Sequence, residues 1–184
     1  MLKMKKITFI TGNKEKVAQL TRHFSLSLEH QALDLPEIQS LDVQEVANYK
    51  AMEAYKIVGK PIMVEDTALT FNAFGKLPGP FVKFFLETVG NEGMTKMLKN
   101  FDDRSALAEV CFAICDEDGV KLFHASIEGS IADSPRGEQG FGWDPIFIPK
   151  GYEKTWGEMT IEAQHQTSMR RKALKDLQKY LESE

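Results

Sequence analysis

The sequence predicts a mixed α/β (α+β) fold, in which an elongated, two-lobed mixed sheet is flanked by helices. Short apolar runs alternate with helical patterns through residues 7–64, in the order β-α-β-α-β. That order favours a sheet covered by helices. Two longer strand-like runs follow, joined around Asp116-Glu-Asp-Gly119, a sequence typical of a hairpin turn. A long antiparallel pair after such a start extends the sheet and predicts a second lobe.

In the first half, the spacing of apolar residues and the turn residues between them define each element. Val17, Leu20 and Phe24 recur at helical spacing, whereas Pro36 and Gly59-Lys60-Pro61 stop the elements before them. The expected elements are a strand at 7–10, a turn at 11–13, a helix at 14–27, a strand at 31–35, a helix at 43–58 and a strand at 62–64.

The second half follows the same logic. Glycine and proline mark loops at 74–80 and 133–145, and an apolar stripe identifies the last helix. The expected elements are short helices at 81–89 and 92–98, two strands within 106–131, a strand at 146–148 and a helix at 168–181.

Length and composition predict one globular domain that spans residues 1–184. The chain is 42% hydrophobic and 27% charged, which is too apolar for intrinsic disorder. Its 23 basic and 27 acidic residues give a net charge of −4, which argues against a protein that binds duplex DNA. A nucleotide ligand stays compatible with this charge, because it needs only a local group of cations.

No segment is typical of secretion or of a membrane span. The basic residues at 1–6 precede only a short apolar stretch, and no apolar run approaches the roughly 20 residues of a membrane helix. Cys111 and Cys115 are too few for a disulfide framework, and their even spacing within a strand predicts two buried thiols on one face. We therefore expect a cytoplasmic protein with no membrane partner.

The stretch Thr11-Gly-Asn-Lys-Glu-Lys16 follows a strand and opens a helix. Free backbone N–H groups, the positive end of the helix dipole and two lysines meet there, which suits an anion such as phosphate. The stretch is not a Walker A loop, because it lacks the Gly-x4-Gly-Lys-Ser/Thr pattern. An ordinary capped helix start with solvated lysines is the alternative.

Acidic residues follow the second and third expected strands. Glu65 and Asp66 come at the end of the strand at 62–64, and Glu37 lies just past the strand at 31–35. Because the carboxyl ends of neighbouring strands meet at one edge of an open sheet, Glu37 and Asp66 would form a Mg²⁺ site. The alternatives are that Asp66 caps the following segment and that Glu37 is a solvated loop residue.

A glycine-rich loop and a cationic helix start are the remaining candidates. In Gly137-Glu-Gln-Gly-Phe-Gly-Trp-Asp-Pro145, Phe141 and Trp143 offer a face for stacking a purine, beside the carboxylate of Asp144. The cluster Ser168-Met-Arg-Arg-Lys172 could neutralise phosphate or contact a base edge. Core aromatics and a solvated helix face are the alternative interpretations. Structural zinc is not expected, because HExxH and paired Cys/His spacings do not occur.

Taken in order, these motifs resemble the inosine triphosphate pyrophosphatase family, also called the Ham1 family. The matching pieces are Ile10-Thr-Gly-Asn13, Leu35-Pro-Glu37, Val64-Glu-Asp-Thr67, Leu77-Pro-Gly-Pro80, Gly140-Phe-Gly-Trp-Asp-Pro145 and Ser168-Met-Arg170. Any single piece is weak evidence, but the ordered set is specific and spans nearly the whole chain.

The resemblance implies an elongated homodimer with a substrate cleft between two lobes in each protomer. It implies hydrolysis of purine nucleoside triphosphates between the α and β phosphates, with Mg²⁺ or, in its place, Mn²⁺. Members prefer ITP, dITP and XTP and so remove them from the nucleotide pool. By position, Glu37 and Asp66 would bind the metal, and Asp66 would be the catalytic base. The substrate-binding positions would be Thr11, Gly12, Asn13, Lys14, Glu15, Lys16, Lys50, Glu65, Thr67, Phe141, Gly142, Trp143, Asp144, Gln164, Met169 and Arg170.

The chain departs from the family at two positions that contact the nucleotide. Met169 stands where the family usually has histidine, and Gln164 where it usually has lysine. Methionine cannot donate a hydrogen bond, and glutamine carries no charge. The same chemistry on a different or broader range of nucleoside triphosphates is therefore one alternative. Another is a non-catalytic protein that binds a nucleotide, or a single strand through Phe141, Trp143 and the cations at 170–172. The acidic residues and the negative net charge argue against binding of a nucleic acid.

Overall fold

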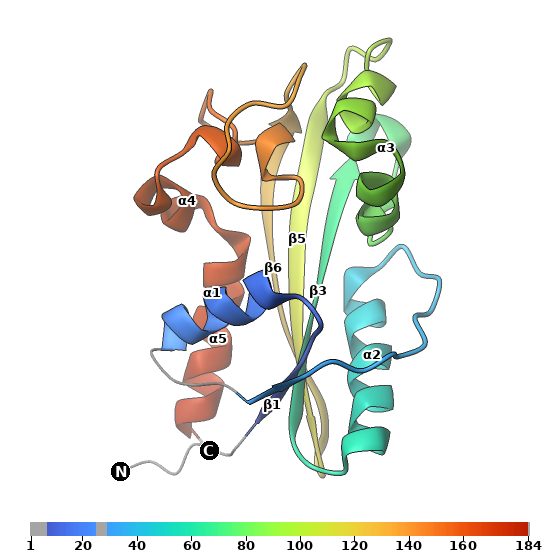
Figure 1. Cartoon of the computed structure of the whole chain (residues 1–184), viewed down its shortest axis with the longest axis vertical. Helices are drawn as coiled ribbons and strands as arrows, with labels where there is room; N and C mark the ends of the chain where they lie inside the picture. Colours follow the sequence, from blue (N-terminus) through green and yellow to red (C-terminus); the bar gives the residue numbers. More distant parts are fainter. Residues whose placement is uncertain (1–6, 25–28, 184) are drawn as a thin grey trace.

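One mixed sheet runs the length of the protein in the computed structural model, which describes residues 7–24 and 29–183 (Figure 1). Its strands lie in the order β2-β1-β3-β5-β6-β7, and β4 pairs with β3. β1 pairs in parallel with β2 and β3, and all other pairs are antiparallel. The strands are β1 (Thr8–Ile10), β2 (His30–Gln31), β3 (Ile62–Phe71), β4 (Pro78–Gly79), β5 (Ser105–Asp116), β6 (Gly119–Ile131) and β7 (Phe147–Pro149). The predicted mixed α/β fold is confirmed.

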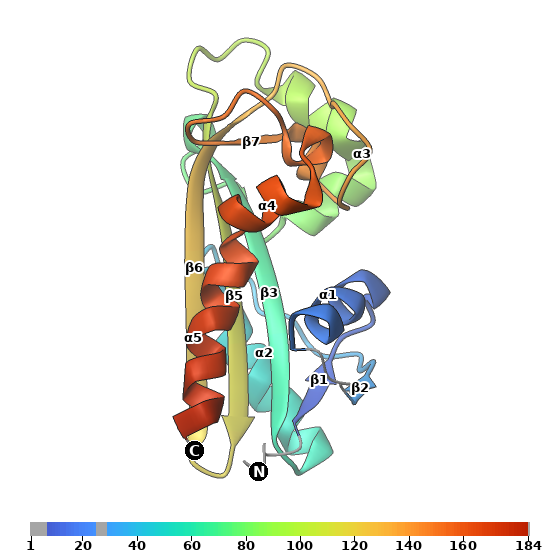
Figure 2. The ribbon, with the colours of Figure 1, turned by 90° about the vertical axis from the view of Figure 1, so that its left-hand side faces the viewer.

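Helices cover both faces of this sheet (Figure 2). The α-helices are α1 (Lys14–Phe24), α2 (Val43–Val58), α3 (Val82–Met97), α4 (Ile161–Thr167) and α5 (Met169–Ser183). Short 3-10 helices span Asn72–Phe74, Asp144–Ile146 and Trp156–Glu158. The predicted end of the first helix, at 25–27, and the basic start at 1–6 lie outside the described residues.

The alternation of side chains along the strands builds a separate core on each face of the sheet. On one face, Phe112 packs in a cluster with Leu174 of α5 and Leu20 of α1. On the other face, Cys111 packs with the small residues of α2 that face the sheet, such as Ala47. Cys111 and Cys115 are free, buried and in the same cluster, as predicted.

The helix α2 begins and ends at the predicted residues, for reasons visible in its caps. The side chain of Asp42 accepts a hydrogen bond from the Gln44 N–H, which satisfies a free amide of the first turn. At the other end Gly59 adopts φ 66°, the left-handed conformation that glycine tolerates best. Gly90, with φ 64° and ψ −179°, likewise interrupts α3 between the two short helices expected there.

The long strands β3, β5 and β6 connect two ends of an elongated molecule. One end carries α1, α2, β1 and β2, and the other carries α3, α4 and β7, while α5 lies along the sheet (Figures 1 and 2). The hairpin of β5 and β6 closes with Asp116 opposite Gly119, at the predicted turn. The described residues include no helix long and apolar enough to cross a membrane.

The third strand is much longer than predicted, so Glu65 and Asp66 lie within the strand and not at its end. β3 does not stop at 64 but continues to Phe71, with Glu65 opposite Phe112 and Asp66 opposite Cys111 of β5. The prediction that these acids stand at a strand end was therefore wrong, because pairing with β5 carries the strand through the polar residues. The other neighbour, β1, does end at Ile10, so β3 has an open edge beside the acids. The strand expected at 31–35 shrinks to His30–Gln31.

Candidate active site

Glu65 and Asp66 are adjacent in β3, so their side chains point to opposite faces of the sheet. Glu65 faces α1 and α5, where it meets Lys16 and Arg170. Asp66 faces α2, where it meets Lys50. The open edge of β3 therefore carries charged groups on both sides, next to the turn that follows β1.

The turn after β1 is shaped by its own polar side chains. The Asn13 N–H donates to the Thr11 hydroxyl over 3.1 Å. Asn13 Oδ1 in turn accepts from the backbone N–H groups of Glu15, at 2.9 Å, and Lys16, at 3.2 Å. This cap fixes the start of α1 at the sheet edge, with Lys14 exposed to solvent. Lys16 instead turns back, and its Nζ donates to the main-chain oxygen of Glu65 over 3.2 Å.

Lys50 joins the two acids predicted to bind a metal. Its Nζ lies 3.1 Å from Glu37 Oε1 and 3.2 Å from Asp66 Oδ1. Burial alone would lower the pKa of Lys50, but the carboxylates of Asp66 and Glu37 raise it. Burial raises the pKa of Asp66 against the opposing effect of Lys50 and Lys16. The structure thus brings Glu37, Asp66 and Lys50 together from three separate segments.

This carboxylate pair fits a hard divalent cation. Asp66 Oδ2 is buried and has no hydrogen-bond partner in the structure, and Glu37 contributes further carboxylate oxygen. Among the described residues, no group of three or more His, Cys, Asp or Glu side chains could hold a metal alone. A cation that takes one or two carboxylates and completes its shell with phosphate and water, as Mg²⁺ does, matches this donor set.

Glu65 lies at the centre of a second charged group on the other face. Its side chain is 0% exposed, and its Oε1 accepts from Arg170 Nη2 at 2.6 Å and from Nε at 3.1 Å. Lys16 Nζ is 3.5 Å from the same oxygen. Burial would raise the pKa of Glu65, but Arg170 and Lys16 lower it below its usual value. Arg170 Nη1 donates to Gln19 Oε1 over 2.9 Å.

The glycine-rich loop lies against Arg170. The Arg170 guanidinium carbon is 5.5 Å from the centre of the Phe141 ring, within the range of a cation–π contact. Asp144 Oδ2 accepts from the Phe141 N–H over 2.8 Å. Gly140 adopts φ 78°, and a Cβ there would lie 2.0 Å from that carboxylate oxygen. The loop conformation therefore requires glycine at this position.

Besides Glu65, three of the predicted substrate-binding side chains are buried or already hydrogen-bonded within the protein. Trp143 is buried, with ring centres 5.6 Å from Trp156 and 5.8 Å from Phe147, so its ring is not the stacking face that we expected. Met169 is 4% exposed and packs in the core. Gln164 Nε2 donates to the main-chain oxygen of Trp156 over 2.6 Å. In this structure the departures from the family pattern are thus buried or paired.

Two residues of this region were not identified from the sequence. Gln19 lies one helical turn after Lys16 on α1, and that spacing was the available signal. Asn91, next to the break in α3, donates from its Nδ2 to the Gly142 oxygen over 2.9 Å and ties the loop to α3. No sequence signal marks Asn91.

Asp144 makes stability depend on pH. Burial raises its pKa from the usual 3.8 to about 6, although the Phe141 N–H and Arg170 oppose the shift. The folded protein therefore binds this proton more tightly than the unfolded chain. The ionised carboxylate thus destabilises the fold above pH 6, and this penalty disappears as the pH falls through 6 toward 4.

We expect Asp144→Asn, which keeps the acceptor oxygen but cannot ionise, to remove this contribution. The Tm difference between variant and wild type should be more positive at about pH 7.5 than at about pH 5. Thermal denaturation of both proteins at the two pH values measures it. Equal differences, or a more positive difference at the lower pH, would contradict the assignment.

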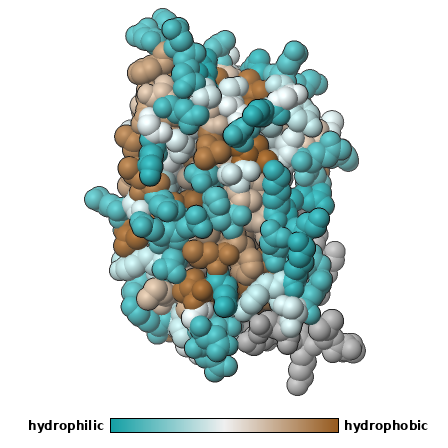
Figure 3. Space-filling model, turned by 180° about the vertical axis from the view of Figure 1, so that it is seen from behind, coloured by the Kyte–Doolittle hydropathy of each residue, from teal (hydrophilic) through white to brown (hydrophobic). Residues whose placement is uncertain are grey.

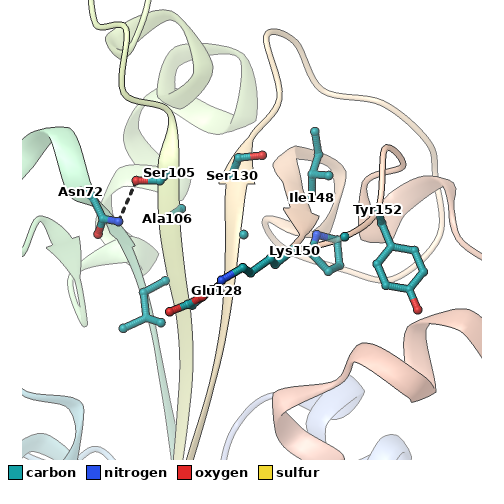
Figure 4. Close-up of a pocket in the computed structure, with 12 residues that line it drawn as sticks. Asn72, Ser105, Ala106, Glu128, Ser130, Ile148, Lys150 and Tyr152 are labelled. Atoms are coloured by element: carbon teal, nitrogen blue, oxygen red, sulfur yellow. Dashed lines mark hydrogen bonds and ion pairs between the residues drawn. The ribbon is translucent and has the colours of Figure 1, made fainter.

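A surface pocket of about 580 Å³ lies elsewhere, where β5, β6 and β7 meet (Figure 4). Asn72 Nδ2 donates to Ser105 Oγ over 2.8 Å on one side of it, and Glu128 pairs with Lys150 on the other. None of the predicted site residues lines this pocket. The candidate site is instead the open edge of β3 with its charged groups.

The fold and this site define an elongated α/β protein with clusters of acidic and basic side chains on both faces of a mixed sheet, beside the open edge of β3. The chain belongs to the Ham1 family, whose model matches residues 7–180. It is 45% identical, over 98% of this chain and 99% of the relative, to an inosine triphosphate pyrophosphatase of Emericella nidulans. The structure resembles the Staphylococcus aureus Ham1 protein, with a TM-score of 0.83 and 28% identity, covering 97% of this chain and 99% of that one.

The name of a third relative states its substrates. The nucleoside-triphosphatase, or dITP/XTP pyrophosphatase, of Mycobacterium abscessus matches with a TM-score of 0.75 and 27% identity. The match covers 93% of this chain and 97% of that one. The resemblance found in the sequence motifs is thus confirmed at the level of the family.

Proposed function

We propose that this protein is a divalent-metal-dependent pyrophosphatase of deaminated purine nucleoside triphosphates: ITP, dITP and XTP. It would cleave between the α and β phosphates, release the monophosphate and pyrophosphate, and so remove these nucleotides from the pool. The observation that carries the proposal is the pairing of Glu37 and Asp66 around Lys50 at the open edge of β3. The names of the relatives supply the substrate class.

The phosphate end of the substrate would meet the cations around β3. Lys14, Lys16 and Lys50 would neutralise charge on the triphosphate, with the turn of Thr11 and Asn13 holding the start of α1 in place. Phosphoryl transfer depends mostly on positioning and charge neutralisation, which such a set provides. To admit the metal and the substrate, Lys50 would exchange its carboxylate contacts for phosphate.

Glu37 and Asp66 would hold Mg²⁺, or Mn²⁺ in its place. The bound ion supplies positive charge that polarises the attacked phosphate. Asp66 would accept the proton of the attacking water, a role that requires its ionised form. Lys50 and Lys16 favour that ionised form against the effect of burial. Thr67, next in β3, would lie against the substrate.

The base would lie between the glycine-rich loop and the start of α5. Arg170 can donate to a 6-oxo group, and the Phe141 ring is half-buried beside it. A site built of donors leaves them unpaired against the 6-amino group of adenine, and such mismatches discriminate strongly. Met169 is buried and the Gln164 amide is already paired, so fewer donors face the base than the family pattern provides.

That shortage of donors favours a second candidate, the same chemistry on a broader range of nucleoside triphosphates. We expect ITP to be preferred over ATP, but by a smaller factor than the family pattern implies, because each missing donor is worth about one to two decades in kcat/KM. Pyrophosphate release from ITP, XTP, dITP, GTP and ATP, each with and without Mg²⁺, tests this. Equal kcat/KM for all five would favour the broad range, and no release from any would favour a binding protein without turnover.

We also propose that the protein is a single-domain, cytoplasmic homodimer. Brown, apolar side chains gather among hydrophilic ones on the face seen from behind in Figure 3, a kind of surface that a second copy can cover. Light scattering coupled to gel filtration measures the mass, and a monomer mass at micromolar concentration would contradict the dimer.

A further inference from the structure

The buried carboxylate of Glu65 has no direct place in the roles proposed above. Its side chain is 0% exposed and lies on the opposite face of β3 from Asp66 and Lys50. Its Oε1 is already approached by three cationic donors, two on Arg170 and one on Lys16. Its Oε2 is buried without a hydrogen-bond partner, but it belongs to a side chain on the face of β3 opposite to Asp66, so Glu65 is poorly placed to join Asp66 at one cation.

The contacts of Glu65 determine where the Arg170 guanidinium lies. Two of its nitrogens, Nε and Nη2, donate to the same carboxylate oxygen, at 3.1 and 2.6 Å. The third, Nη1, donates to Gln19 Oε1 at 2.9 Å. Charge-assisted bonds of this kind, out of water, restrict a long side chain that would otherwise sample many rotamers. The guanidinium is thus held in one orientation, against the Phe141 ring.

We propose that Glu65 is a positioning residue that acts through Arg170, and that it sets base selectivity without touching the substrate. This proposal rests on the proposed function, in which Arg170 contacts the purine. Glu65 connects the middle of β3 to the first turn of α5, and Gln19 connects α1 to the same group. Selectivity then depends on residues that face away from the base as well as on those beside it.

The main effect of Glu65 is on Arg170, because Lys16 has a separate anchor. Lys16 Nζ donates to the main-chain oxygen of Glu65 over 3.2 Å, closer than its 3.5 Å contact with the carboxylate. That main-chain bond survives any substitution of the side chain. Changing Glu65 should therefore release the guanidinium while leaving the phosphate end largely in place.

A double-mutant cycle with Glu65→Gln and Arg170→Met tests this. Each single change should lower kcat/KM for ITP by about 10- to 100-fold, the value of a charged hydrogen bond. Each should also reduce the ITP to ATP ratio, that is, kcat/KM for ITP divided by kcat/KM for ATP. The double variant should be no worse than Arg170→Met alone, because residues that act through one another are not additive. The Mg²⁺ concentration for half-maximal rate should not change. Additive losses, or a raised Mg²⁺ requirement, would overturn the proposal.

Gln19→Ala is the second variant, because it leaves no buried charge and should fold even where Glu65→Gln does not. It should lower the ITP to ATP ratio by about tenfold or less in the wild-type background and have no effect in the Arg170→Met background. Calorimetric binding of inosine monophosphate without metal should weaken in parallel. The proposal is overturned if both Gln19→Ala and Glu65→Gln leave the ITP to ATP ratio and the binding of inosine monophosphate unchanged. If Glu65→Gln does not fold, the same two unchanged results in Gln19→Ala alone overturn it.

Glu128→Gln is the matched control, since it breaks an exposed ion pair with Lys150 in the distant pocket of Figure 4. It should leave both the ratio and the binding unchanged. Failure of the proposed function would show in the wild type, as no pyrophosphate release from ITP. Failure of the Glu65 proposal would show only in the variants, with the wild type active.

Discussion

Replacing Asp66 with asparagine should lower kcat for ITP by about 10³-fold or more. The change keeps the shape of the side chain but removes the charge and the proton acceptor. Loss of a general base alone costs about 10² to 10⁴ in rate, and the lost charge toward a divalent cation adds to that. In contrast to a core residue, Asp66 lies at the open edge of β3, half-buried beside Lys50.

The fold of Asp66→Asn should survive. The Tm should stay within about 4 °C of wild type, because burial already disfavours the ionised carboxylate and partly offsets the lost pairing with Lys50. Steady-state kinetics and thermal denaturation of the same preparation provide both numbers. Asp176→Asn, an exposed carboxylate on α5, is the control and should change neither. A kcat close to that of wild type in Asp66→Asn would refute the catalytic role.

The position of Asp66 illustrates what the sequence alone could predict about the site. The order of motifs identified Glu37 and Asp66, and the family resemblance added Lys50. In the structure Lys50 Nζ lies 3.1 Å from Glu37 Oε1 and 3.2 Å from Asp66 Oδ1. The strand that carries Asp66 was predicted too short, because Glu65-Asp-Thr67 interrupts the apolar pattern. Pairing with a strand some 40 positions later in the chain stabilises β3 there, and local periodicity contains no information on that partner.

The base end was harder to predict than the phosphate end for a related reason. Motif matching treats Trp143 and Met169 as ligand contacts, whereas both side chains pack in the core. For Met169 the signal was present, since it precedes Ala173 and Leu174 at helical spacing on the apolar side of α5. For the bond from Asn91 to the glycine-rich loop there was none, because it joins two segments that only the tertiary structure brings together.

Removing divalent cations should abolish turnover, with a residual rate at least about 10³-fold below that with Mg²⁺. The described part of the chain offers only paired carboxylates, Glu37 and Asp66, at the proposed site. Lys50 stands between them and offsets part of their negative charge in the absence of a metal. A triphosphate would draw Lys50 away and leave two acids facing a polyanion, an arrangement that repels substrate unless a cation joins it.

A catalytic metal ion and a structural metal ion would give different results with EDTA. Chelation should eliminate pyrophosphate release while changing the Tm little, because Lys50 hydrogen-bonds both Glu37 and Asp66 in the metal-free protein. Added Mg²⁺ should restore the rate, and Mn²⁺ should substitute for it. Full activity in EDTA would contradict the proposal that catalysis requires a divalent cation. A large fall in Tm on chelation would instead show that the ion supports the fold. The inference that Lys50 holds Glu37 and Asp66 in place without the ion would then be wrong.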